Sequence, residues 1–392
     1  MLPAETMGVF FLNGPDGLMT ESAAELLPLT TRVIQQGITE HLHSGVQLYV
    51  SQNFQTVADL AVGEDRPGIP LSTETILPWL SAGKPLTAAL ILQRMDAGKL
   101  SLDEPVAHLL PEFAAAGKEQ ITLKDLLTHQ AGLKPIATGW PKRSWSDIVE
   151  KICRTGIRRD RGEGSRIGYD PARSWFILGE ILQKIDDRQR SIDQIMREDL
   201  LEPLGMWDSW MAIPESRRND ILPRLGSVWN TQHHQLTPLP MNTEEYCRTP
   251  SPGGSLRGPI RELARFYEML LRGGTTQQGQ RLLKTETVTA MILRQREGEF
   301  DVTFQHRVDF GLGIIINSNR YGPETVPYGF GRFASEEAFG HGGAQSSIGF
   351  ADPKYNLVVT AVANGHPGEE IHNQRFRELN SALYQDLGLA KA

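Results

Sequence analysis

The sequence predicts an α+β fold: one antiparallel sheet built from both ends of the chain and flanked by helices, with a mostly helical lobe inserted. Strand-like segments lie within residues 45–65 and 309–363, whereas helical periodicity dominates the segment between them. We expect residues 22–84 and 301–392 to form the sheet domain and residues 85–300 the helical domain, with a site in the cleft between them. Residues 1–21 are predicted to be an N-terminal extension.

The N-terminal part of the sheet is predicted to be a β-hairpin. Residues 46–50 and 56–62 are rich in β-branched residues and are joined by a short polar turn. A helix over about 22–43 precedes them. The helical part shows apolar periodicity in several segments, which predicts helices near residues 84–95, 121–130, 172–182, 192–201, 260–271 and 284–296.

The second half of the sheet is predicted from the C-terminal part of the chain. Apolar segments over 310–316, 347–353 and 357–362 are typical of strands, and the last two are spaced as a hairpin. The segment His341-Gly342-Gly343 lies on or beside a further strand. A closing helix is expected over 369–387.

Composition excludes several classes of protein. The 392 residues carry a net charge of −7 with no basic stripe, so nucleic acid is not expected as a partner. No segment approaches the roughly 20 apolar residues of a membrane helix, and the N-terminus lacks the pattern of a signal peptide, which predicts a cytoplasmic protein unless a leader has been removed. No metal-ligand spacing and no cofactor motif is found. Cys153 and Cys247 are expected as reduced thiols, although one bridge between them stays open.

The spacing of Ser81 and Lys84 is the first indication of a catalytic site. If a helix begins near Ser81, the lysine one turn later shares its face and points at the serine hydroxyl. That is a nucleophile beside a candidate proton acceptor, close to free N–H groups at a helix start. Taken alone, the same four residues also fit a helix cap with an exposed lysine.

Further candidates stand elsewhere in the chain. Tyr169 lies in a loop just before a predicted helix that Asp170 is placed to cap. With Ser81 as nucleophile, Lys84 and Tyr169 can supply a base and an acid, and the N–H groups of Ser81 and Ala344 an oxyanion site. His129 invites a catalytic interpretation, but a histidine bonded to backbone at a helix end is the better hypothesis.

Several stretches in order along the chain carry a family resemblance. They are Ser81-Ala82-Gly83-Lys84, the segments 93–113 and 121–133 (ITLKDLLTHQAGL), Tyr169-Asp170-Pro171, PLGMWDS at 203–209, PGGSLRGPIRELARF at 252–266 and His341-Gly342-Gly343. Together they resemble the class C β-lactamase-related serine hydrolases, which have a penicillin-binding-protein-like fold and include esterases, D-aminopeptidases and acyltransferases. The resemblance covers roughly residues 22–387.

The resemblance implies roles for these residues. Ser81 would be the acylated nucleophile, with Lys84 and Tyr169 sharing base and acid work and His341 bonding Tyr169 or a substrate carboxylate. Gly342 and Gly343 would let substrate lie close to the strand. Pro171 stands where β-lactamases have an amide that binds substrate, and His341 stands where they have lysine.

Both departures argue against efficient β-lactam hydrolysis, because proline has no side-chain donor and histidine carries a weaker positive charge. The resemblance therefore implies a carboxylesterase-like hydrolase of small ester or amide substrates, with weak or no β-lactamase activity. A β-lactamase, a D-amino-acid peptide hydrolase, an acyltransferase and a non-catalytic binding protein remain as alternatives. The oligomeric state is left open.

Overall fold

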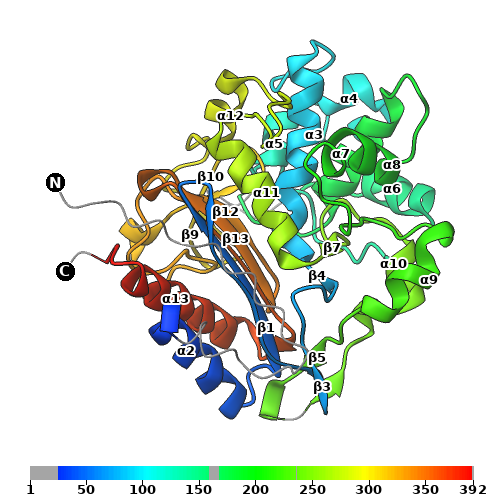
Figure 1. The fold of residues 1–392 in the computed structure, drawn as a ribbon. Helices are drawn as coiled ribbons and strands as arrows, with labels where there is room; N and C mark the ends of the chain where they lie inside the picture. Colours follow the sequence, from blue (N-terminus) through cyan, green and yellow to red (C-terminus); the bar gives the residue numbers. More distant parts are fainter. Residues whose placement is uncertain (1–24, 159–166, 235, 391–392) are drawn as a thin grey trace.

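The computed structural model describes residues 25–158, 167–234 and 236–390. The predicted N-terminal extension, residues 1–21, lies outside them. An eight-stranded antiparallel sheet joins the two ends of the chain in the order β10-β11-β12-β13-β14-β1-β2-β3 (Figure 1). Its strands are β1 (Gly45–Gln52), β2 (Gln55–Arg66), β3 (Ile69–Pro70), β10 (Asp309–Phe310), β11 (Ile315–Ile316), β12 (Phe339–Gly343), β13 (Ser347–Asp352) and β14 (Leu357–Ala363). The predicted construction of the sheet from both chain ends is confirmed.

Helices cover both faces of this sheet. The helices α2 (Pro28–Thr39) and α13 (Glu369–Asp386), from the two ends of the described chain, pack together on one face, as expected. The helix α2 ends earlier than the predicted 22–43, since the chain turns after Thr39 with His41 at a φ of +57°. Residues 22–24 of that prediction lie outside the described residues. The other face is covered by α11 (Ile260–Leu271), which comes from the part of the chain assigned to the helical domain. The predicted domain boundaries stay a prediction.

Strand β14 is apolar at every position except Thr360, and the burial of both its faces explains this. Successive side chains of a strand point to opposite faces. Val359 and Ala361 belong to the core cluster that contains α13 side chains, whereas Val358 and Val362 belong to the cluster that contains α11 side chains. With both faces buried, apolar side chains stand on both sides of the strand. The hydroxyl of Thr360 is satisfied by donating to the Ile260 carbonyl of α11 at 2.9 Å.

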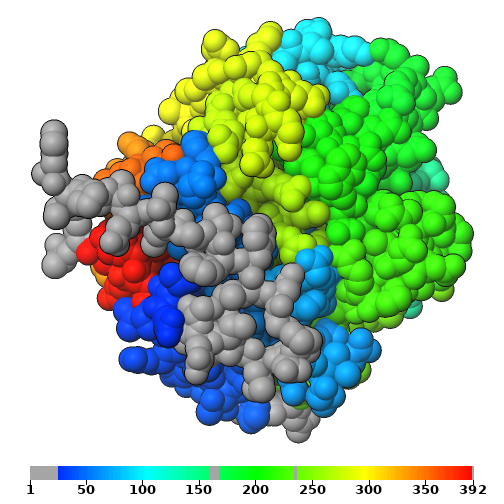
Figure 2. Space-filling model, viewed as in Figure 1, coloured from blue at the N-terminus to red at the C-terminus, as the bar shows by residue number. Residues whose placement is uncertain are grey.

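The remaining helices form a block beside the sheet. Figure 2 shows this block, coloured cyan to yellow, on the opposite side of the molecule from the blue and red terminal helices. The central helix α3 is buried from Lys84 through Leu92, in keeping with a helix that is packed on all sides. The helices are α3 (Lys84–Asp96), α4 (Val106–Leu109), α5 (Leu123–Leu127), α6 (Trp145–Arg154), α7 (Arg173–Lys184), α8 (Ile192–Met196), α9 (Arg218–Ile221), α10 (Glu244–Arg248) and α12 (Thr285–Ile292).

Short strand pairs link distant parts of the chain. β4 (Leu77–Pro78) pairs with β7 (Arg257–Gly258) just before the predicted nucleophile. The other pairs involve β5 (Trp229–Asn230) with β6 (Thr237–Pro238) and β15 (Gly365–His366), and β8 (Phe300–Asp301) with β9 (His306–Arg307).

The prediction of one strand over 310–316 is wrong. β10 ends at Phe310, and the chain reverses before β11, with the Gly311 N–H donating to the Ile314 carbonyl at 2.8 Å. Gly313 has a φ of +71°, which glycine adopts without strain. A Cβ on Gly311 would lie 2.1 Å from the Met291 carbonyl oxygen. The two glycines therefore make a tight turn inside an apolar run that reads as continuous.

Over residues 25–158, 167–234 and 236–390, no helix combines the length and apolarity needed to cross a membrane. The same ranges contain no group of three or more His, Cys, Asp or Glu side chains placed to hold a metal ion. Cys153 and Cys247 are free and buried. The cytoplasmic location and the lack of a nucleic-acid partner stay predictions.

Candidate active site

Ser81 lies in a single 3₁₀ turn, Leu80–Gly83, directly before α3. The turn is anchored by Trp79, whose indole N–H donates to the Gly258 carbonyl at 3.0 Å. The carbonyl of Trp79 accepts a hydrogen bond from the Ser347 hydroxyl at 2.6 Å. These contacts tie the serine turn to both the helical part and the sheet.

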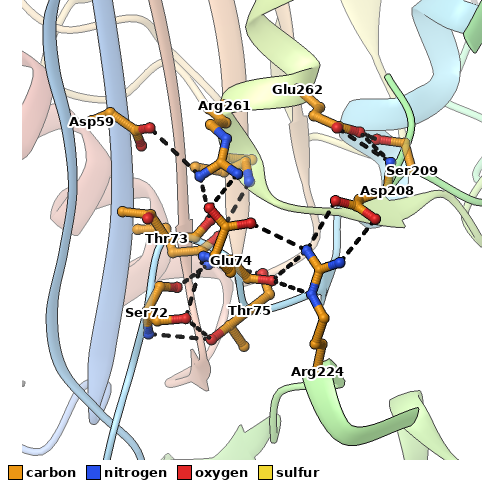
Figure 3. Close-up of polar contacts among 12 residues, drawn as sticks. Asp59, Ser72, Thr73, Glu74, Thr75, Asp208, Ser209, Arg224, Arg261 and Glu262 are labelled. Carbon is orange, nitrogen blue, oxygen red and sulfur yellow. Dashed lines mark hydrogen bonds and ion pairs between the residues drawn. The ribbon is translucent and has the colours of Figure 1, made fainter. Parts of the chain in front are cut away.

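Ion pairs hold the segment that leads to this turn (Figure 3). Glu74 accepts from Arg261 of α11 at 2.5 Å and from Arg224 at 3.3 Å. Arg224 also pairs with Asp208 at 2.9 Å. These groups are partly exposed, so each pair adds little stability. Together they join the segment at Glu74, which leads to Ser81, with three other segments of the chain.

Lys84 is completely buried and is held by three oxygen atoms. Its Nζ lies 2.9 Å from the Pro171 carbonyl oxygen, 2.5 Å from the Gly253 carbonyl oxygen and 2.8 Å from Ser81 Oγ. The carbonyls can only accept, so they take two N–H groups of the amine. The third position of Nζ faces the serine hydroxyl, as the sequence spacing predicts.

Burial also makes Lys84 a candidate base. Removal from water lowers the pKa of Lys84 to about 7, and the attraction of Asp170 only partly opposes this. Near pH 7 the neutral amine is therefore well populated. Its lone pair can then accept the Ser81 proton.

Tyr169 is fixed by its backbone in the loop before α7. Its N–H donates to both carboxylate oxygens of Asp301, at 3.0 and 2.9 Å, and its carbonyl accepts from the Thr303 hydroxyl at 3.0 Å. The ring of Phe304 stacks on the phenol at 4.7 Å. The next residue, Asp170, caps α7 as predicted, accepting N–H groups at 2.9 to 3.1 Å.

The phenol of Tyr169 stays protonated at ordinary pH. Burial raises the pKa of Tyr169 above its usual value, and a hydrogen bond with the side chain of Ser81 offsets only part of this. The tyrosine therefore reaches the nucleophile as a neutral group that can donate and accept a proton within a relay. It is not a phenolate base.

His341 lies on β12 and faces the same cluster. Its ring centroid is 5.8 Å from that of Tyr169, and its Nδ1 donates to the Gly342 carbonyl at 2.7 Å. Burial and the nearby Lys84 lower the pKa of His341 to about 3, so the imidazole is neutral. The implied hydrogen bond to Tyr169 is not found. Nδ1 of His341 bonds to the Gly342 carbonyl, and Nε2 has no hydrogen-bond partner among the described residues.

The space beside each of the two glycines after His341 is filled by other residues of the protein. A Cβ on Gly342 would lie 2.1 Å from the ring of Tyr328, and one on Gly343 would lie 2.2 Å from the Trp79 carbonyl oxygen. Their small size thus lets β12 approach Tyr328 and the serine turn. The expected approach of a substrate to these glycines stays a prediction. Ala344 follows directly in the turn to β13.

The structure brings Ser81, Lys84, Tyr169 and His341 into one cluster. Gly253 and Asp301 were missed. The sequence marks 252–255 as a glycine-rich turn, which is a weak signal for a carbonyl aimed at a buried amine. Asp301 has no signal, because its contact with Tyr169 joins residues 132 positions apart.

Comparison with known proteins matches the family model described as Beta-lactamase over residues 30–384. The ML-236A carboxylate methylbutanoyltransferase mlcH of Penicillium citrinum is 31% identical, over 81% of this chain and 82% of that protein. The esterase/beta-lactamase LipL of Mycobacterium tuberculosis is 24% identical, over 82% of this chain and 77% of that protein.

The fold is also that of a solved relative. The crystal structure of a penicillin-binding protein homologue from Caulobacter crescentus superposes with a TM-score of 0.75 at 25% identity, covering 95% of this chain and 99% of that one. The family model spans nearly all of the described sheet and helical block. The chain therefore belongs to the beta-lactamase family and is a serine hydrolase of the kind related to penicillin-binding proteins.

Proposed function

We propose that the protein is a carboxylesterase-like hydrolase that works through an acyl-enzyme on Ser81. The observation that carries this proposal is the position of Lys84. Its Nζ lies 2.8 Å from Ser81 Oγ, and its other contacts are carbonyl oxygens that take two N–H groups. A pKa of about 7 makes this amine a base at neutral pH.

The reaction follows from these contacts. Neutral Lys84 takes the Ser81 proton as Oγ forms a bond to the ester carbonyl carbon, and the carbonyl oxygen becomes an oxyanion held by the N–H groups of Ser81 and Ala344. The intermediate collapses and the C–O bond to the alcohol breaks. The leaving oxygen takes a proton relayed from Lys84 through Tyr169. Water then attacks the acyl-enzyme by the same steps, releasing the acid and restoring Ser81.

Esters are favoured over β-lactams by two features of the site. Neutral His341 supplies no fixed positive charge for a carboxylate. Pro171 has no side-chain donor, and its carbonyl oxygen is used by Lys84. An alkoxide leaves with less help from a proton donor than an amide nitrogen does. Ser81, Lys84 and Tyr169 are therefore sufficient for the hydrolysis of short esters.

The test compares p-nitrophenyl butyrate with the β-lactam nitrocefin. We expect turnover of the ester and, for nitrocefin, a kcat/KM about a hundredfold lower or less, because the groups that would bind its carboxylate and amide are missing. Ser81→Ala should abolish ester turnover and labelling by a fluorophosphonate. Ser101→Ala, which removes an exposed hydroxyl after α3, should change neither. Absence of Ser81 labelling in the wild type, or faster turnover of nitrocefin than of the ester, would contradict the proposal.

Acyl transfer is the second candidate, favoured by the methylbutanoyltransferase at 31% identity. It differs from hydrolysis only in the second step, where an alcohol replaces water. Adding a primary alcohol to the p-nitrophenyl butyrate reaction and measuring the ratio of new ester to free acid separates the two. Free acid alone would leave hydrolysis as the activity.

A further inference from the structure

The loop that carries Tyr169 is held by a histidine from another part of the chain. We propose that His129 is a positioning residue for Tyr169, which fixes the backbone of residues 168–170 so that the phenol faces Ser81. This inference rests on the proposed function of Ser81 and Tyr169. It assigns His129 no contact with substrate.

His129 bonds this loop twice. It lies just after α5, where its backbone carbonyl accepts the Gly168 N–H at 3.2 Å. Its Nδ1 accepts the Asp170 N–H at 3.0 Å. The N–H between them, that of Tyr169, is taken by Asp301. Three consecutive N–H groups are therefore held from outside the loop, two of them by one residue.

The imidazole of His129 also contacts the phenol directly. Its ring centroid is 4.7 Å from that of Tyr169, 5.0 Å from Phe310 and 6.0 Å from Trp175. The histidine is 1% exposed. The ring is therefore packed beside the phenol in the core, which places its Nδ1 acceptor within reach of the tyrosine loop.

The hydrogen bonds fix the form of the ring. A backbone N–H can only donate, so Nδ1 is unprotonated and the ring proton lies on Nε2. Burial, together with Arg296, His341, Lys84 and Arg173, holds the pKa of His129 well below its usual range. A protonated ring would place an N–H against the Asp170 N–H. His129 thus works as a fixed acceptor and not as an acid or base.

The structure shows which backbone group His129 bonds. The prediction that His129 bonds to backbone is correct, but the bonded backbone is that of residue 170 and not that of its own helix end. Asp170 already caps α7 through its carboxylate. The contact from His129 is therefore an additional restraint on the turn that aims Tyr169.

Two variants separate the acceptor from the ring. His129→Asn places an amide oxygen near the Nδ1 position and tolerates the φ of +59° found here. His129→Phe keeps a ring but offers no acceptor. We expect the Phe variant to acylate Ser81 with p-nitrophenyl butyrate about ten- to a hundredfold more slowly, since misplacement by about 1 Å can cost a hundredfold. The Asn variant should stay within about threefold of wild type.

Hydrogen exchange of the peptide that contains residues 168–170 gives a readout that needs no substrate. Exchange should be faster in the Phe variant and close to wild type in the Asn variant. The apparent pKa of the acylation rate should be the same in all three proteins, because Lys84 sets it. Unchanged exchange in the Phe variant would overturn the proposal, as would equal acylation rates in the two variants or a shifted pH profile. A wild type that does not acylate Ser81 would refute the proposed function, while the exchange result would still decide whether His129 holds the loop.

Discussion

Two lysines of the helical block, Lys84 and Lys118, have nearly matching surroundings. Both are completely buried, and within the described residues each amine bonds to carbonyl or hydroxyl oxygens and not to a carboxylate. The Nζ of Lys84 lies 5.4 Å from the ring centroids of Tyr169 and Trp175, and the Nζ of Lys118 lies 5.3 Å from that of Phe113. Burial lowers the pKa of both.

Their hydrogen-bond partners differ in one place. Lys118 donates to three backbone carbonyls, those of Ala115, Cys153 and Thr155. Because none of these oxygens can donate, all three N–H groups are needed, and the contacts favour the ammonium form. Loss of a proton would leave one carbonyl facing a lone pair. Lys118 is thus suited to holding the ends of segments together.

At Lys84 the third carbonyl is replaced by the hydroxyl of Ser81. A hydroxyl can donate as well as accept, so the neutral amine satisfies every partner as well as the ammonium does. The comparison teaches that burial alone does not make a lysine a base. A partner that can give up a proton is also required.

The largest expected effect comes from exchanging each lysine for methionine. Lys84→Met removes the proton acceptor while keeping the length of the side chain, and we expect kcat/KM for p-nitrophenyl butyrate to fall by about a thousandfold. Lys118→Met should leave kcat/KM of the folded protein within about twofold of wild type. The comparison fails if Lys84→Met keeps more than about a tenth of the activity.

The contact behind this prediction could be read from the sequence because it is local. Ser81 and Lys84 are three residues apart at a helix start, and helix geometry alone brings them together. The assignment of the sheet to both chain ends also succeeded, since β-branched runs such as 357–362 keep their pattern whether or not their partner strand is near in sequence.

The parts that escaped prediction depend on long-range contacts and on backbone atoms. The carbonyl of Gly253 has no side chain to mark it, and it meets Lys84 across 169 positions. The reversal at Gly311 lies inside an apolar run, where hydrophobicity does not report a turn. His129 was correctly given a structural role, but no sequence pattern tells which backbone it bonds.

A smaller effect is expected on stability at Lys118. Lys118→Met leaves three buried carbonyls without their donor, each costing about 1–3 kcal/mol, while removal of a buried charge returns part of this. We expect the free energy of unfolding to fall by about 3 kcal/mol in urea titrations. The control is Lys99→Met, which breaks an ion pair between Lys99 and Asp187 at the surface and should cost less than about 1 kcal/mol. Equal losses in the two variants would mean that the carbonyls around Lys118 are satisfied in another way.

The smallest expected effect is the pH dependence of acylation, which reports the protonation of Lys84 itself. The folded protein holds the pKa of Lys84 at about 7, and only the neutral amine accepts the Ser81 proton. Below that value kcat/KM should therefore fall about tenfold per pH unit, and above it the rate should reach a plateau. The plateau should not end at moderately alkaline pH, because burial raises the pKa of Tyr169 and keeps its relay proton in place. A rate that still rises with pH near 10 would mean that Lys84 has the pKa of an exposed lysine, and that burial beside Ser81 does not make it a base at neutral pH.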